Sequence, residues 1–281
     1  MSVTTPAYAR LTAAFPGLRV AEGTPRSGDG WVGAWELAQG GAALAAFTGL
    51  DTEELAREYG RPPRPHVAAT LALHRYAWAA CLLFTVPWFL HRRVPRLPVA
   101  DVAFHRASGR ITVRTREFGC LPGDPAAALP GARVLADEAA LREELRAALA
   151  EHLAPLFAVF GPRMRRGPHA LWAMATDEIA EGLWYVARLT GREEEAVAEL
   201  TALLPGGTPP YAGGADFRRI AHGANSPGAA GGSAGPPQAG GGCARDRLTC
   251  CLFYTISPEQ TCASCPRGTE SDRIRRRATA A

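Results

Sequence analysis

Four of the seven cysteines in this 281-residue chain, Cys250, Cys251, Cys262 and Cys265, lie within one window of 16 residues. They form a double cysteine, followed after ten residues by a C-x2-C pair. Thiolates are soft, strongly donating ligands, and four of them within loop reach of one another can hold an iron–sulfur cluster or a zinc ion. Consecutive residues of a strand point to opposite faces, so we expect a turn or a helix start at the double cysteine.

The window resembles the C-terminal cluster motif of the FhuF-type ferric-siderophore reductases. Its flanks match that family in Arg247 before the double cysteine, the pair Phe253-Tyr254 after it, and Pro266 after the last cysteine. The resemblance is looser around residues 74–76 and 171–176. The chain departs from the family at residues 257–261, where a glycine is expected.

The resemblance implies that Cys250, Cys251, Cys262 and Cys265 bind a [2Fe–2S] cluster. The C-x2-C pair can chelate one iron, which leaves the double cysteine for the other, so we expect a distorted site. The family's activity implies an oxidoreductase that passes one electron to siderophore-bound iron(III), of the hydroxamate type, and releases iron(II). The chain has no Walker-type or dinucleotide-binding glycine motif, which favours an electron-donor protein such as a ferredoxin.

Other interpretations compete with this one. A zinc-stabilised tail would make the chain a non-enzymatic binding protein, although a bare double cysteine is a poor zinc knuckle. Disulfides would require an oxidising compartment. A relationship to siderophore synthetases, which share a domain of this name, is disfavoured because the chain is short and lacks a phosphate loop.

Composition and charge narrow the partners and the compartment. The net charge of +4 does not indicate a nucleic-acid-binding protein. The longest apolar run, 76–90, spans 15 residues and contains Pro87, whereas a membrane span needs roughly 20 residues. The first residues lack the basic and apolar regions of a signal peptide. We therefore expect a cytoplasmic protein without a membrane span.

We predict an α+β fold with a mostly helical, siderophore-binding body over residues 1–222, which contains a small antiparallel β-sheet. Residues 223–242, of which eight are Gly and three are Pro, predict a flexible linker, because such a segment cannot offset its ordering entropy. Residues 243–281 form the cysteine-rich iron–sulfur module with its basic tail. That module must dock on the body to act on a substrate bound there.

Local signals predict the elements of the body. The first 60 residues should form short helices. The other expected elements are a helix from Asp51 to Gly60, a long helix from Pro65 that Pro87 bends or ends, a β-hairpin over 99–113 with its turn at 107–109, a helix from Asp137 kinked at Pro155, and a helix from Pro168 to about Gly191.

Several side chains have two interpretations. Asp177, Glu178 and Glu181 could be general acids, but we expect a solvated helix face. Trp172, Trp184 and Tyr185 could wall a siderophore pocket, but core packing is the safer expectation. His66 and His74 do not have the spacing of a metal site.

Arginines near the cluster motif and the three cysteines outside it also have expected roles. Arg245, Arg247 and Arg267 are expected to raise the potential of the cluster. The tail residues Arg273 and Arg275 to Arg277 are either solvated or a docking patch for an acidic electron donor. The other cysteines are a buried Cys81, an unpartnered Cys120 and Cys243, a possible substitute ligand.

Overall fold

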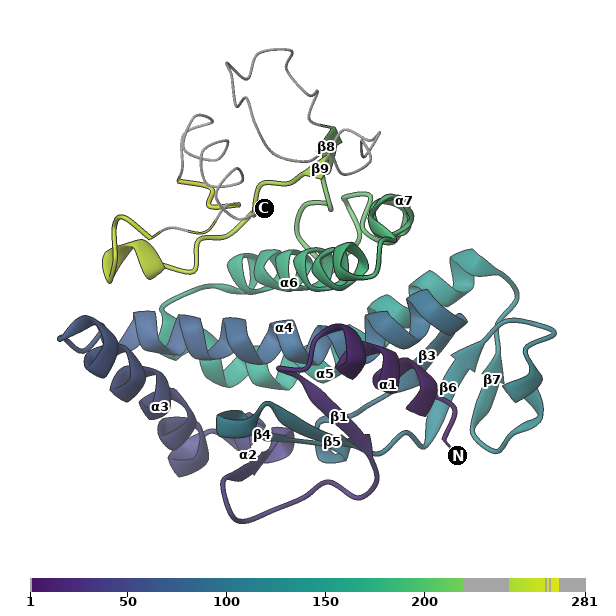
Figure 1. Cartoon of the computed structure of the whole chain (residues 1–281), viewed down its shortest axis with the longest axis horizontal. Helices are drawn as coiled ribbons and strands as arrows, with labels where there is room; N and C mark the ends of the chain where they lie inside the picture. The colour runs from purple at the N-terminus through teal and green to yellow at the C-terminus, as the bar shows by residue number, and fades with distance from the viewer. Residues whose placement is uncertain (1, 220–242, 261, 263, 268–281) are drawn as a thin grey trace, which may run out of the picture.

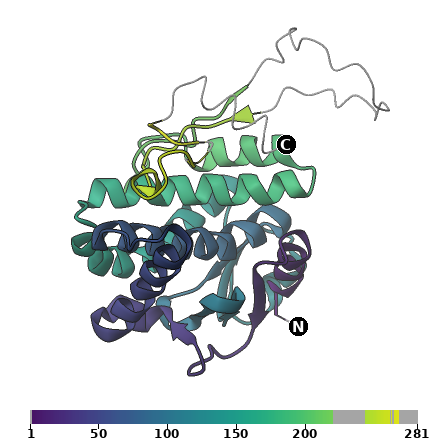
Figure 2. The same cartoon turned by 60° about the vertical axis from the view of Figure 1, so that its left-hand side comes forward.

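The computed structural model describes residues 2–219, 243–260, 262 and 264–267. Its helices and small sheets confirm the predicted α+β class. Helix α4 (Pro65–His91) runs through the middle of the molecule and packs against α5 (Glu138–Met164) and α6 (Pro168–Leu189). The two larger sheets lie on one side of this helical layer, and the C-terminal segment lies over α6 on the other (Figures 1 and 2).

The N-terminal region contains α1 (Thr5–Ala14), β1 (Arg19–Glu22), β2 (Trp31–Gly33), α2 (Ala34–Gln39) and α3 (Gly41–Tyr59). The expectation of a helix starting at Asp51 is wrong, because α3 begins ten residues earlier. Asp51 is buried inside α3 and accepts a hydrogen bond from Arg106, which removes it from the solvent that a helix-starting carboxylate normally faces. Gly60 ends α3 as expected, with a left-handed φ of 71°.

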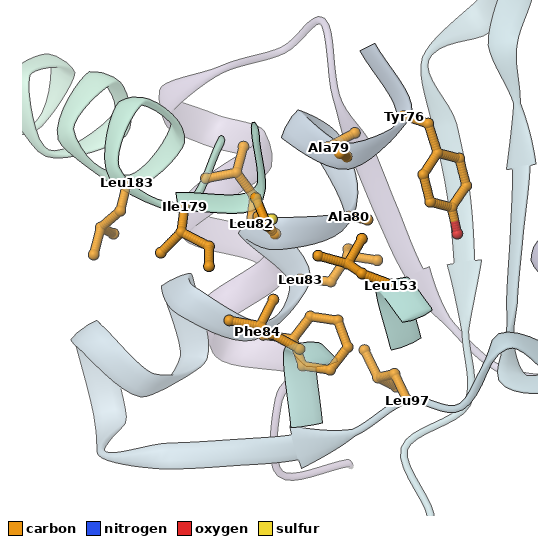
Figure 3. Close-up of a cluster of buried hydrophobic side chains, with 14 of the residues drawn as sticks. Tyr76, Ala79, Ala80, Leu82, Leu83, Phe84, Leu97, Leu153, Ile179 and Leu183 are labelled. Atoms are coloured by element: carbon orange, nitrogen blue, oxygen red, sulfur yellow. The ribbon is translucent and has the colours of Figure 1, made fainter. Parts of the chain in front are cut away.

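Helix α4 continues through Pro87 to His91, so Pro87 does not end it. A proline leaves the carbonyl four residues earlier without its helical donor. Here that carbonyl belongs to Leu83, and the Tyr8 hydroxyl donates to it at 2.9 Å. By length and composition α4 could cross a membrane, but 83% of its most apolar window is buried inside the molecule, as in the core helix of a soluble protein. Phe84, Leu153 and Ile179 meet in this core, one from each of α4, α5 and α6 (Figure 3).

Two small sheets lie on α4. One has the order β1-β5-β4-β2 and the other β3-β6-β7, with β3 (Arg93–Arg96), β4 (Val102–His105), β5 (Arg110–Val113), β6 (Glu117–Cys120) and β7 (Ala132–Val134). The expected hairpin is β4–β5. The expected antiparallel pairing holds for β4 with β5, β4 with β2 and β3 with β6, whereas β1 pairs parallel with β5 and β7 with β6. Hairpin signals are local in the sequence, whereas β1 lies about 90 residues before its partner β5. Local signals therefore did not predict this pairing.

The hairpin turn depends on Gly109, which has a φ of +60°. A Cβ atom there would lie 2.0 Å from the carbonyl oxygen of Gly17. Gly109 therefore allows the hairpin to approach the loop before β1.

Helix α5 begins after Asp137, whose side chain accepts from the Ala140 N–H at 2.8 Å. It continues past Pro155 to Met164, and α6 begins at Pro168 as expected. Helix α7 (Glu193–Leu203) follows, and β8 (Arg218–Arg219) pairs with β9 (Cys243–Ala244). The predicted linker, 223–242, lies outside the described residues, and the division into body and module stays a prediction.

Candidate metal centre

Arg245 fixes the start of the cysteine segment on α6. Its side chain is fully buried, and its guanidinium donates to the Asp177 Oδ1 at 2.8 Å and to the Ala215 carbonyl at 2.7 Å. A third contact, at 3.3 Å, reaches the Glu181 carboxylate. A buried arginine is stable only when its donors are paired in this way. The buried position of Arg245 therefore depends on its pairing with the carboxylates of α6.

Asp177 receives four of the hydrogen bonds that hold the segment. Besides Arg245, it accepts from the backbone N–H groups of Leu248 and Thr249, both at 2.8 Å, and from the Thr249 hydroxyl at 2.7 Å. Our expectation of a solvated face for Asp177, Glu178 and Glu181 is wrong, because Asp177 and Glu178 are fully buried and face the arginines of the module.

Glu178 links the module to α4. It accepts a hydrogen bond from Arg247, and its Oε1 lies 2.6 Å from the Nδ1 of His74. Burial alone would raise the pKa of Glu178, but the charges of His74 and Arg247 hold that pKa below its usual value. Burial likewise opposes the charge of Arg247, yet the neighbouring carboxylates raise the pKa of its guanidinium. Both groups are therefore charged at neutral pH.

A turn directly follows the double cysteine, as expected from the need to bring two sulfurs together. Leu252 follows with a left-handed φ of 67°, and a single 3-10 turn, η4 (Phe253–Thr255), comes next. A non-glycine residue in this conformation costs about 1–2 kcal/mol, which is typical of ligand-binding turns. The Leu252 N–H points to the Cys250 Sγ at 3.4 Å.

The thiols of the two cysteine pairs affect one another's pKa. A hydrogen bond between Cys262 and Cys251 lowers the pKa of Cys251, with help from the Phe253 N–H and from the charges of His74 and Arg247. The same bond raises the pKa of Cys262. Burial raises the pKa of Cys250, and the charges of Cys251 and Cys265 add to this effect. The four sulfurs thus share one electrostatic environment.

The far side of the segment packs on α3 and the start of α4. Ile256 is buried against Leu55, Val67 and Leu71. The Phe253 ring meets Tyr59 edge to face, with 5.7 Å between centroids.

Arginines of the body also hold the segment by its backbone. Arg61 donates to the Ile256 carbonyl at 3.1 Å, and Arg166, after α5, donates to the Cys250 carbonyl at 2.8 Å. The cysteine segment is therefore held from α3, α4 and α6 and from the loop after α5.

This donor set fits an iron–sulfur cluster. All four cysteines are free thiols, and backbone N–H groups and Arg247 stand ready to stabilise the thiolate form that ligation requires. Within the described part of the chain, no three His, Cys, Asp or Glu side chains are arranged around a single metal ion. The residues would hold the cluster as two pairs of thiolates.

The other candidates fall into different places. Trp172 packs edge to face on Phe157 and Tyr211, and Trp184 on Phe217, which supports core packing for both. Cys81 is buried as expected, Cys243 is half-buried in β9, and the Arg267 guanidinium stacks over the Tyr254 ring. The basic residues 273–277 lie outside the described residues.

Sequence reasoning missed the partners of Arg245 and Arg247, which contact His74 and the carboxylates of α6. A signal was available, because residues 171–187 of α6 are apolar or small all round, apart from these acidic positions and Thr176. On such a helix a carboxylate needs a buried partner.

Comparison with known proteins identifies this segment. Residues 247–267 match the family model of the FhuF 2Fe-2S C-terminal domain. The match contains the four clustered cysteines and excludes Cys243. It confirms the FhuF-type resemblance and points to a [2Fe–2S] cluster as the cofactor. No curated protein matches the chain.

Proposed function

Because residues 247–267 match the FhuF 2Fe-2S domain, we propose that the chain is a cytoplasmic ferric-siderophore reductase. A bound [2Fe–2S] cluster supplies one electron at a time. The observation that carries the proposal is the four-cysteine segment held on the body by buried ion pairs of Arg245 and Arg247 with Asp177 and Glu178. Such anchoring fixes the position of a redox group relative to a substrate on the body.

Cys250, Cys251, Cys262 and Cys265 are the proposed ligands. The N–H groups of Leu252 and Phe253 donate to the two sulfurs of the double cysteine. Hydrogen bonds to sulfur and nearby positive charge both favour the reduced, more negative state of a cluster. Arg247 contributes this charge while it is paired with Glu178, which moderates the effect.

The reaction needs one electron and no acid–base residue. Iron(III) held by hard oxygen donors gains the electron and becomes iron(II), which those donors hold far less tightly. The free siderophore and iron(II) are then the products. This chemistry requires free thiols and a reducing compartment, which supports the cytoplasm.

The electron donor is proposed to be an acidic protein such as a ferredoxin. Arg163, in the last turn of α5, and Arg165, which follows the helix, are exposed, and the next residue, Arg166, donates to the carbonyl of Cys250. A basic surface beside a ligand residue steers an acidic partner to the point where an electron must enter.

The test is steady-state reduction of a ferric tris-hydroxamate under nitrogen, with a ferredoxin system as donor and a ferrous chelator as reporter. We expect chelated iron(II) to form with the cluster-loaded chain and not with Cys262→Ser. A colourless protein with one zinc per chain and no reduction would favour the non-enzymatic binding protein instead.

A further inference from the structure

Three parts of the molecule meet at the Glu178 carboxylate. Glu178 belongs to α6, which lies between α4 and the C-terminal segment (Figure 1). Its side chain is fully buried, and one of its oxygens, Oε1, serves two partners. The Nδ1 of His74, on α4, lies 2.6 Å from this oxygen, and Arg247 of the C-terminal segment donates to the same oxygen. Glu178 therefore joins α4 to an arginine just before the double cysteine.

The contact with Glu178 fixes the proton on the His74 ring. An ionised carboxylate only accepts hydrogen bonds, so the Nδ1 of His74 carries a proton in both charge states of the imidazole. The guanidinium of Arg247 lies 3.4 Å from this Nδ1. Both groups are donors there, so their close approach is stable only while the Glu178 oxygen accepts from both.

Glu178 has no hydrogen bonds to described residues other than these two. Its second oxygen, Oε2, is buried without a partner, as is the Nε of Arg247. The pair is thus joined at one point and lacks the two parallel hydrogen bonds that arginine and carboxylates often form. A carboxylate held at one point can turn about it. The hydrogen bond from His74 therefore determines how Glu178 faces Arg247.

His74 and Arg247 both act on the cysteines of the metal centre. After the hydrogen bonds from Cys262 and the Phe253 N–H, their charges are among the causes that lower the pKa of the Cys251 thiol. Positive charge near an iron–sulfur cluster favours its reduced state. The placement of these two side chains therefore affects the reduction potential of a cluster that the cysteines hold.

We propose that His74 is a positioning residue of the metal centre: its hydrogen bond fixes the Glu178 carboxylate and, through it, the Arg247 guanidinium beside the double cysteine. This inference rests on the proposed function, in which the cluster takes up and passes on one electron. Without the imidazole, Glu178 can turn fully toward Arg247 and neutralise more of its charge. The reduced state of the cluster then loses stabilisation, and its reduction potential falls.

The test is a redox titration of the cluster-loaded chain without oxygen, followed by visible absorbance and electron paramagnetic resonance. His74→Leu removes the donor to Glu178, whereas His74→Asn keeps one, because the asparagine amide NH2 group takes about the place of Nδ1. His66→Leu is the matched control, at a half-buried histidine about two turns earlier on α4. We expect His74→Leu to lower the equilibrium constant for reduction about tenfold, or about 59 mV for one electron, and the other two variants to change it by less than about threefold.

Hydrogen exchange of the cluster-free chain tests whether His74 positions Arg247 or merely anchors the segment. The buried pair of Asp177 with Arg245 is untouched in His74→Leu. Exchange in residues 245–256 should therefore rise by no more than about tenfold, the effect of one ordinary hydrogen bond. A larger rise would overturn the positioning role, because the segment would then have left the body.

An unchanged potential in His74→Leu, or an equal fall in His74→Asn or His66→Leu, would also overturn the proposal. If His74→Leu failed to hold the cluster, retention of the cluster by His74→Asn would support the proposal and its loss from both variants would overturn it. Reduction of a ferric tris-hydroxamate by the wild type is measured in parallel. Its absence would reject the reductase and leave the comparison of potentials intact, whereas reduction with equal potentials would reject the role of His74 alone.

Discussion

Replacing Asp177 with Asn should release the cysteine segment from α6 without unfolding the helical body. The change keeps the size of the side chain but removes the charge opposite the fully buried Arg245. Asp177 accepts four hydrogen bonds, from Arg245, Leu248 and Thr249. The change also replaces one of the accepting oxygens by an amide NH2 group, which is itself a donor. Removing one partner of a buried ion pair costs about 3–5 kcal/mol.

That cost applies mainly to the docked state of the segment, because the body keeps its apolar core around α4, α5 and α6. At about 1.4 kcal/mol per tenfold change, the docking equilibrium should fall by about 100- to 4,000-fold. Hydrogen exchange followed by mass spectrometry measures this opening in peptides that cover residues 245–256. Peptides of α5 and the helical circular dichroism report on the body.

Glu194→Gln is the control, since Glu194 pairs at 3.3 Å with Arg219 and both side chains are more than 70% exposed. Exposed pairs contribute about 0–1 kcal/mol, so exchange in residues 245–256 should change by less than about fivefold. If Asp177→Asn left this exchange unchanged while the body stayed folded, the anchoring role of the ion pair would be refuted.

Three further predictions concern the ligands, acid stability and the electron donor. Single Ser substitutions at Cys250, Cys251, Cys262 or Cys265 should abolish or strongly shift the visible spectrum of the cluster. Those at Cys81, Cys120 or Cys243 should not. Loss of the spectrum in Cys243→Ser, together with an unchanged spectrum in Cys250→Ser, would contradict the ligand assignment. Burial lowers the pKa of His152 from 6.5 to about 4, so the neutral form stabilises the fold fully above pH 6.5, and about 3 kcal/mol is lost as the pH falls to 4. Urea unfolding should show this loss in the wild type and a shallower one in His152→Asn; equal slopes would contradict the burial argument. The double change Arg163→Glu/Arg165→Glu should raise the KM for an acidic ferredoxin about tenfold at low salt and leave the dithionite-driven rate unchanged. The control Arg19→Glu, at another exposed arginine, should not change this KM. An equal KM in the double variant and the control would contradict the proposal that Arg163 and Arg165 bind the donor.

The sequence predicts the parts of this molecule that depend on neighbouring residues. Helix α5 starts after Asp137 because a side-chain cap is local, and the β4–β5 turn falls at Gly109 for the same reason. The cysteine motif is local as well, and residues 247–267 match the family that it indicates.

Long-range partners were not predictable from local signals. Pro87 does not end α4 because Tyr8, 79 residues earlier, satisfies the Leu83 carbonyl that proline leaves free. Local signals predict a surface position for Asp177, because its partner Arg245 lies 68 residues away in the chain. Only the packing of the C-terminal segment on α6 brings these charges together.

The most direct measurement of the central claim is a single turnover without oxygen. The cluster-loaded chain is reduced with dithionite, freed of excess reductant, and mixed with a ferric tris-hydroxamate in the presence of a ferrous chelator. The account predicts that the oxidised visible spectrum returns as one iron(II) is trapped for each electron that the chain held. A reduced spectrum that persists, with no iron(II) above the level of a Cys262→Ser control, would contradict it.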